Sequence, residues 1–300
     1  MIAALPFPDI DPVLFSTEIF GFTLAIRWYA LAYIAGFILA WRWIVRLMRR
    51  DDQWPGNAAP MSAKQVEDLL TWMILGTILG GRLGYVLFYR PDMILHDPAA
   101  ILRVWEGGMS FHGGFLGVVL AGLLFCRVNL LPVWSVGDAV AFAAPFGLFL
   151  GRLANFINGE LWGRPTDVPW AVVFPGEAAQ SCPIWWLGEV CSRHPSQIYE
   201  ALLEGVVLFA VMAVLAFGYK VLKRPGVMVG VFLLGYGTAR VIVETFRQGD
   251  AHYVSMANPM GHIIRFGSEL DSAGLTMGQL LSIPMILIGL ALIWLRRNAI

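Results

Sequence analysis

The sequence predicts an all-α polytopic membrane protein with about seven transmembrane helices and a small extracytoplasmic cap. Of its 300 residues, 58% are hydrophobic and only 14% are charged, and the mean hydropathy is +0.67. A soluble protein of this length covers its surface with far more charge, so lipid is the expected solvent for much of this surface. The formal net charge is zero, so no basic excess points to a nucleic-acid partner.

Seven stretches approach the roughly 20 predominantly apolar residues that a spanning helix needs. They lie at about 20–47, 66–89, 111–128, 135–156, 197–219, 226–246 and 275–295. The third and fourth are rich in glycine and polar residues, so their limits are the least sharp. The sequence shows no internal repeat and no low-complexity linker, and residues 1–300 are therefore predicted to form a single membrane domain.

The lysines and arginines predict how these helices are oriented. With seven crossings, the basic residues near 42–64, 127, 220–224 and 296–297 fall on one face, and this face holds every lysine. Short loops rich in lysine and arginine stay in the cytoplasm. The N-terminus is therefore predicted to be periplasmic and the C-terminus cytoplasmic.

The connection at about 157–196 is predicted to form the cap. It is too polar to span a membrane, contains several prolines and is too long for a simple turn. Cys182 and Cys191 both lie in it, where an oxidising compartment would permit a disulfide. The alternative is two separate thiols. No CxxC pair in the sequence suggests a metal site.

Several polar side chains lie within or at the ends of the apolar stretches. They are Arg27, Arg82, His112, Asp138, Arg152, Asn155, Glu200, Glu204, Arg240, Glu244 and Arg247. An arginine near the bilayer centre costs on the order of 2.5–3.5 kcal/mol on insertion scales. Each group therefore needs a partner inside the bundle or a wet cavity that holds a substrate. Gly80 and Gly84, beside Arg82, have the spacing of closely packed helices, so Arg82 is expected to pair inward.

Arg240, Glu244 and Arg247 stand at i, i+4 and i+7, on one face of the sixth predicted helix. One glutamate neutralises one arginine, which leaves a positive charge over. Because arginine forks suit phosphate oxygens, the row predicts an anion site near the outer leaflet. The alternative is an Arg–Glu–Arg clip that locks helices together.

The motif GRLANFINGELWGR ends the fourth predicted helix. Arg152 and Asn155 share a helix face, and structural capping alone would not require so many polar side chains there. The glycines that follow permit close backbone approach, as a loop around a lipid headgroup would need. This helix end is therefore a second candidate for contact with an anionic lipid.

His112 opens the third predicted helix beside Gly113 and Gly114, which are expected to give it room to be approached. The alternative is an ordinary hydrogen-bonded interior histidine. By the predicted topology, His112 lies at the same membrane level as Arg152 and Arg240. The three side chains are therefore predicted to meet in one pocket beneath the outer headgroups.

Six segments carry a resemblance to a known family. They are RWYALAY, GGRLGYVLFY, WEGGMSFHGGFLG, GRLANFINGELWGR, RHPSQIYEALLEG and YGTARVIVETFRQ. In this order, and over nearly the whole chain, they resemble the bacterial phosphatidylglycerol–prolipoprotein diacylglyceryl transferase (Lgt) family. The resemblance is least specific at about 176–193, where the cysteine pair lies.

The resemblance implies an enzyme of the bacterial inner membrane with its active site toward the periplasmic leaflet. Such an enzyme moves the diacylglyceryl group of phosphatidylglycerol to the thiol of the lipobox cysteine in a prolipoprotein signal peptide. It releases glycerol 1-phosphate, in the first step of lipoprotein maturation. The implied catalytic residues are His112, Arg152 and Arg240. The implied substrate-binding residues are Arg152, Tyr29, Asn155, Glu160, Gly163, Glu244 and Arg247.

The chemistry of that reaction fits these residue types. A free thiol has a pKa of about 8.5, and its thiolate is the strong nucleophile. His112 suits a general base; alternatively, the arginine potential activates the thiol and His112 orients the substrate. Arg152 and Arg240 would stabilise the leaving phosphate. The scheme requires no metal or cofactor. The alternative function is a transporter of anionic lipids or organic anions, which would more often show internal repeats.

Overall fold

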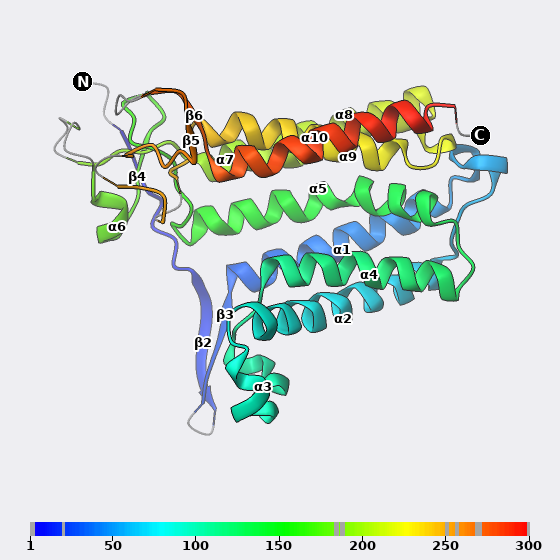
Figure 1. The fold of residues 1–300 in the computed structure, drawn as a ribbon, viewed down its shortest axis with the longest axis horizontal. Coiled ribbons are helices and arrows are strands. Elements are labelled where there is room, and N and C mark those ends of the chain that lie inside the picture. Colours follow the sequence, from blue (N-terminus) through cyan, green and yellow to red (C-terminus); the bar gives the residue numbers. More distant parts are fainter. Residues whose placement is uncertain are drawn as a thin grey trace. The chain divides into compact units, whose positions relative to one another are not determined.

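The computed structural model describes residues 4–19, 22–182, 186, 190–249, 252–255, 258–267 and 272–298. Among these residues, seven helices are long and apolar enough to cross a membrane (Figure 1). They are α1 (Trp28–Met48), α2 (Ala63–Phe88), α4 (Phe111–Val128), α5 (Val133–Ile157), the helix Ser196–Gly218, α9 (Val227–Glu244) and α10 (Met277–Arg296). The prediction of an all-α polytopic membrane protein with about seven spanning helices is confirmed.

The chain divides into two compact units. The large unit consists of Met1–Ala40 and Ala141–Ala299, and the small unit contains Trp41–Val140. Helices α1 and α5 therefore each contribute one end to either unit. The single domain expected over residues 1–300 stays a prediction.

A β-hairpin precedes α1 in the large unit. Strands β2 (Val13–Ile19) and β3 (Phe22–Arg27) pair antiparallel, with Ser16 opposite Ala25. The predicted start of the first spanning helix, at about residue 20, is wrong, because this helix begins at Trp28. The β-branched and aromatic residues of both strands favour an extended chain, and pairing satisfies its backbone groups.

Shorter elements connect the long helices. The paired two-residue strands are β1 (Leu5–Pro6) with β4 (Val172–Val173) and β5 (Ile264–Arg265) with β6 (Gly274–Leu275). The short helices are α3 (Asp92–His96), α6 (Glu177–Gln180) and 3₁₀ turns at Asp51–Gln53, Pro55–Asn57, Pro98–Leu102, Val104–Glu106 and Val221–Lys223. These elements lie in the connections, so the spanning helices dominate both units.

Glycines bring α2 and α4 into backbone contact in the small unit. A Cβ atom on Gly117 would lie 2.0 Å from the carbonyl oxygen of Gly76, and one on Gly113 would lie 2.3 Å from that of Gly80. This confirms the close packing predicted from Gly80 and Gly84. Gly113 packs against the backbone of α2, whereas the neighbouring His112 side chain is exposed.

The helix Ser196–Gly218 in the large unit contains two π-helical stretches. It consists of α7 (Ser196–Glu200), a π-helical stretch Ala201–Val207, α8 (Leu208–Ala213) and a second π-helical stretch Val214–Gly218. Single turns of π-helix are frequent at functional sites, where an extra residue redirects side chains. The first of these stretches adjoins the charged residues described below.

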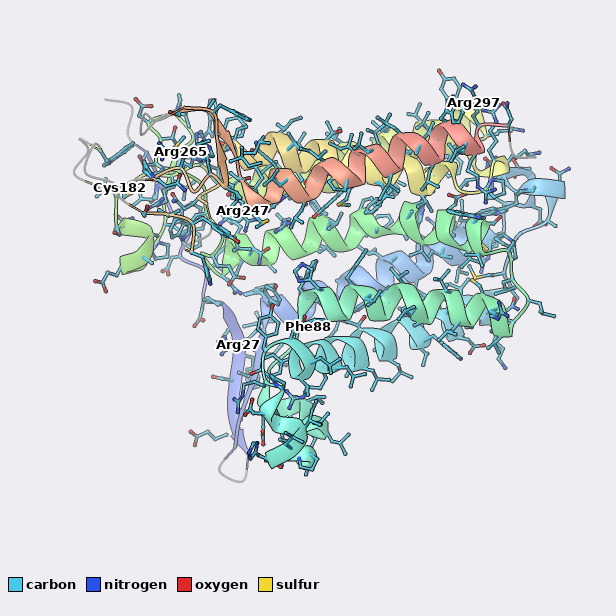
Figure 2. The ribbon with its side chains drawn as sticks, in the orientation of Figure 1. Arg27, Phe88, Cys182, Arg247, Arg265 and Arg297 are labelled. Carbon is cyan, nitrogen blue, oxygen red and sulfur yellow. A yellow bond between two sulfur atoms is a disulfide. The ribbon has the colours of Figure 1, made fainter. Side chains whose placement is uncertain are left out.

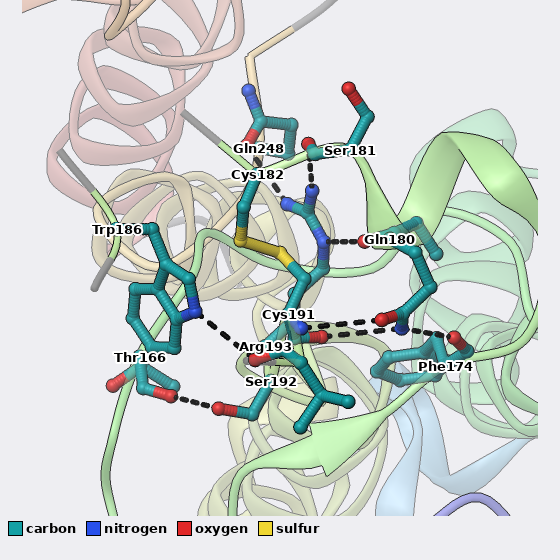
Figure 3. Close-up of a disulfide and its surroundings, with 12 residues drawn as sticks. Thr166, Phe174, Gln180, Ser181, Cys182, Trp186, Cys191, Ser192, Arg193 and Gln248 are labelled. Atoms are coloured by element: carbon teal, nitrogen blue, oxygen red, sulfur yellow. Dashed lines mark hydrogen bonds between the residues drawn. A yellow bond between two sulfur atoms is a disulfide. The ribbon is translucent and has the colours of Figure 1, made fainter. Parts of the chain in front are cut away.

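The ends of the large unit differ in character. Arg247, Arg265 and Cys182 lie at one end, and Arg297 lies at the other (Figure 2). The segment predicted as the cap, 157–196, belongs to the first end, where Val172, Phe174 and Ala179 form a small apolar core with Phe7, Phe156 and Trp162. Cys182 and Cys191 form a disulfide with a Cα–Cα distance of 5.6 Å (Figure 3). The disulfide that the sequence left open is therefore present.

Candidate active site

Three arginines and three glutamates form one ionic network in the large unit. Its centre is Glu200, the last residue of α7, whose side chain is fully buried. Glu200 Oε2 lies 2.9 Å from Arg152 Nε, and Glu200 Oε1 lies 2.7 Å from Arg240 Nη1 and 3.2 Å from Arg247 Nη1. One carboxylate therefore ties α5, α7 and the end of α9 together.

Two further carboxylates complete the network. Glu204 Oε2 lies 3.5 Å from Arg152 Nε. Glu244 forms an ion pair with Arg240 one turn away on α9, and its Oε2 accepts a hydrogen bond of 2.8 Å from Thr276, which caps α10. Glu204 thus has a partner inside the bundle, one of the two alternatives expected for charges at membrane depth.

The charges of the network balance, three against three. The positive charge expected to remain over in the row Arg240, Glu244 and Arg247 is therefore compensated, because Glu200 approaches from another helix. The row does lock helices together, as the clip interpretation predicted. A buried ion that lost its partner would cost several kcal/mol, so the network has to assemble as a unit.

The two signs of charge are not equally accessible. The side chains of Glu200 and Glu204 are 0% exposed, whereas those of Arg152 and Arg240 are each 16% exposed and that of Arg247 is 12% exposed. The guanidinium groups therefore form the accessible side of the network, and the carboxylates lie behind them. A clip that served packing alone would not need this order.

The end of α5 and the turn after it contain Asn155 and Glu160, two of the implied substrate-binding residues. Asn155 Nδ2 donates a hydrogen bond of 2.8 Å to Glu160 Oε1, and Gln197 Nε2 donates one of 2.6 Å to the carbonyl oxygen of Glu160. On α1, the hydroxyl groups of Tyr29 and Tyr33 are 3.4 Å apart, and Tyr33 interacts electrostatically with Arg152 and Glu160. Tyr29 is thus linked to the network through a second tyrosine.

Gly163 lies where the chain has no room for a side chain. Its N–H donates to the carbonyl oxygen of His194 at 2.8 Å, and it forms an antiparallel bridge with Arg247. A Cβ atom here would lie 2.6 Å from the carbonyl oxygens of both His194 and Phe246. Glycine is therefore required for the loop after α5 to reach the arginine that ends the charged row.

The groups beside this bridge titrate differently from free side chains. Burial lowers the pKa of His194, and the nearby charge of Arg164 lowers it further. Burial also lowers the pKa of Arg164 itself. His194 is consequently held in its neutral form in this part of the cap.

His112 belongs to the small unit. It is the second residue of α4, its side chain is exposed, and its imidazole makes no hydrogen bond to the described residues. The alternative of an interior, hydrogen-bonded histidine is therefore wrong. The arginines lie in the large unit, so the meeting of His112 with Arg152 and Arg240 stays a prediction.

Known proteins resemble this chain over nearly its whole length. The sequence model of the prolipoprotein diacylglyceryl transferase family matches residues 13–295. The chain belongs to this family. A phosphatidylglycerol–prolipoprotein diacylglyceryl transferase of Cereibacter sphaeroides is 57% identical over 286 residues, covering 95% of this chain and 96% of the relative. Relatives of the same name from Ruegeria pomeroyi and Roseobacter denitrificans are 55% and 52% identical, over 97% and 100% of this chain and over 96% and 100% of their own lengths.

One residue of the ionic network was not predicted as part of the site. Glu200 stood among the polar residues at membrane depth, but the sequence assigned it no role. The signal was its spacing, because Glu200 and Glu204 are i and i+4 on one helix face and match the spacing of Arg240 and Glu244. Among the described residues, no cluster of three or more histidine, cysteine or acidic side chains could hold a metal ion.

Proposed function

We propose that this chain transfers the diacylglyceryl group of phosphatidylglycerol to the thiol of the lipobox cysteine in prolipoproteins. The carrying observation is the layered network, with accessible guanidinium groups in front of buried carboxylates, in a chain of the transferase family. The relatives' names give phosphatidylglycerol and a prolipoprotein as the two substrates. The product released would be glycerol 1-phosphate, in the first step of lipoprotein maturation.

The proposed reaction replaces a carbon–oxygen bond by a carbon–sulfur bond. The thiolate attacks the glyceryl carbon that bears the phosphate ester, and the bonding electrons leave with the phosphate oxygen. The thiol proton passes to a base or to water. Negative charge grows on the phosphate in the transition state, where preorganised donors in a low-dielectric site act most strongly. Arg152 and Arg240 are the proposed donors.

The network suits a phosphate that arrives and leaves. A guanidinium carries five N–H donors, and Arg247 makes only one ion pair with the described residues, through Nη1. A headgroup phosphate can therefore bind the exposed edge of Arg152, Arg240 and Arg247 while Glu200 keeps them in place. Five further residues hold the turn and the helices around the network, and we propose them as supporting residues. They are Asn155, Glu160, Gly163, Tyr29 and Glu244.

Two roles for His112 follow from this scheme. As a general base, it would take the thiol proton; as an orienting donor, it would leave thiol activation to the arginine potential. Rates of His112→Gln and His112→Asn across pH would separate them. If His112 is the general base, both variants should lose most of the transfer rate at neutral pH. Near-normal turnover in either variant would exclude that role.

The proposed setting is the bacterial inner membrane, with the N-terminus periplasmic, the C-terminus cytoplasmic and the active site toward the periplasmic leaflet. The distribution of lysine and arginine supports this orientation. Within the large unit, Arg247 lies at the end that carries the disulfide, opposite to Arg297 near the C-terminus (Figure 2). An oxidising compartment at that end suits the Cys182–Cys191 bond.

The test uses the purified full chain in vesicles that contain acyl-labelled phosphatidylglycerol, with a synthetic lipobox peptide as acceptor. Transfer of label to the cysteine is the expected result, with release of glycerol 1-phosphate in equal amount. A peptide with serine in place of the cysteine is the matched control and should remain unlabelled. Absence of transfer combined with flux of labelled lipid or organic anions would favour the transporter alternative.

A further inference from the structure

Arg82 is a buried arginine that the proposed reaction does not use. Its side chain lies in the small unit, only 4% exposed, and pairs with no acid among the described residues. It donates instead to four backbone carbonyl oxygens. The distances are 3.0 Å from Nε to Ile101, 2.5 Å from Nη2 to Ala100, and 2.5 Å and 3.1 Å from Nη1 to Gly107 and Gly108. The arginine thus fastens the connection between α2 and α4 at four points.

Two of these carbonyls belong to the turn directly before His112. Gly107 and Gly108 have φ angles of 84° and 76°, which side-chain-bearing residues rarely adopt. A Cβ atom on Gly108 would lie 2.6 Å from the ring of Tyr85 and 2.9 Å from Arg82 Nη1. The turn is therefore shaped to bring its carbonyls onto the guanidinium.

The same turn of α2 also contacts the residues on either side of His112. The N–H of Ser110 donates to the carbonyl oxygen of Gly81 at 2.8 Å, and Ser110 Oγ accepts from the N–H of Gly113 at 3.2 Å. Gly113 in turn touches the backbone of Gly80. His112 consequently stands between two anchor points on α2, while its own imidazole is exposed.

We infer that Arg82 is a positioning residue for His112 in the transfer reaction. It fixes the entry into α4, so that the imidazole is presented to the reacting groups in one orientation. Hydrogen bonds from a charged donor are stronger than those between neutral groups, so four of them hold this turn more firmly than neutral contacts would. The inference rests on the proposed function and adds to it a residue outside the ionic network.

The test compares Arg82→Lys with Arg103→Ala, a matched control in the same connection whose partners, Asp97 and Glu106, are exposed. A lysine keeps the charge but cannot reach four carbonyls. We expect Arg82→Lys to lower kcat at least about tenfold per folded molecule, with KM for phosphatidylglycerol within about threefold of the wild type. Arg103→Ala should retain both constants. A raised KM with unchanged kcat would overturn the inference.

A second measurement needs no activity. In protein labelled at histidine, the His112 resonance is identified by its absence from His112→Gln, and it should broaden or split in Arg82→Lys but not in Arg103→Ala. Gly108→Ala, which loosens the same turn, replaces Arg82→Lys if the latter does not fold. A His112 resonance unchanged in a folded variant would overturn the positioning role. A wild type without transferase activity would instead refute the proposed function, and the resonance would still report on Arg82.

Discussion

Arginines at membrane depth are stabilised in two different ways in this molecule. In the ionic network, Arg152 and Arg240 face carboxylates, so each partner is itself a charge. In the connection before α4, Arg82 faces backbone carbonyls, which carry no charge that an anion could replace. The first arrangement allows a phosphate to compete for the guanidinium groups, whereas the second only fixes the chain. The kind of partner therefore separates the arginines that we propose to bind substrate from those that hold structure.

Removing the central carboxylate should have the largest effect. Glu200→Gln leaves Arg247 without its ion pair and removes one from each of Arg152 and Arg240. Breaking a buried pair typically costs about 3–5 kcal/mol, so the thermal unfolding midpoint should fall markedly. Glu177→Gln, at an exposed position of the same unit, is the control. Unfolding of Glu200→Gln at the wild-type temperature would mean that the network does not depend on Glu200.

Changing the shape of one guanidinium should impair catalysis more than folding. Arg240→Lys keeps the charge that Glu200 and Glu244 require, but a point charge cannot present a fork to phosphate. We expect transfer rates to fall by about 10²–10³, the usual effect of losing one transition-state donor. Arg297→Lys, at the other end of the large unit, should leave the rate unchanged. Wild-type turnover in Arg240→Lys would contradict phosphate binding by this residue.

A carbonyl-held arginine in the cap should affect stability alone. Arg193 is buried, and its guanidinium carbon lies 4.0 Å from the ring centroid of Trp162. Its guanidinium donates to backbone carbonyls that include those of Ala179 and Ser181 (Figure 3). Burial lowers its pKa to about 10, which still leaves it charged at neutral pH. Arg193→Gln leaves buried acceptors unpaired, at about 1–3 kcal/mol for each group.

The measurement for Arg193→Gln is the thermal unfolding midpoint beside the transfer rate per folded molecule. The midpoint should fall and the rate should stay within a few-fold of the wild type. Arg90→Gln removes an exposed ion pair with Asp92, which contributes little to stability because solvent screens it, and serves as the control. A rate loss like that of Arg240→Lys would erase the distinction between the two kinds of arginine.

The smallest expected effect is a loss of folding stability at low pH. The pKa of His194 in the folded chain lies below its ordinary value of 6.5, and that of His262 is lowered too, in both cases mainly by burial. As the pH falls, the unfolded chain therefore binds a proton at each of these histidines before the folded chain does. Stability should be constant above about pH 6.5 and should fall as the pH drops toward the folded-state pKa values of these histidines.

Unfolding midpoints recorded between pH 8 and pH 5 measure this effect. His194→Gln should flatten the profile, whereas His96→Gln, at an exposed position, should not. A wild-type profile that stays flat, or one that rises toward acid, would contradict a lowered pKa in the cap.

The spanning helices could be predicted because their signal is local. A run of about 20 apolar residues specifies a helix in lipid whatever surrounds it. The hairpin escaped prediction because Phe22–Arg27 is apolar and continuous with α1, and hydropathy does not distinguish a strand from a helix. Pairing with β2 decides the outcome, and pairing is not visible in one segment.

The site was predictable by residue type rather than by partner. Arg152, Arg240 and Arg247 were identified because charge at membrane depth is costly. The role of Glu200 as their shared partner was not predicted, because contacts over 40 to 48 residues of sequence depend on helix packing. The Cys182–Cys191 bond was left open for the same reason, since a disulfide depends on a distance that the sequence does not contain.

The π-helical stretch Ala201–Val207 has a consequence for the registration of its helix. A turn of this kind corresponds to one residue more than a regular α-helix would use. In a regular α-helix, one extra residue would rotate everything that follows by about 100°. The wider turn absorbs this residue, so Glu200 still meets all three guanidinium groups while α8 continues the same helix.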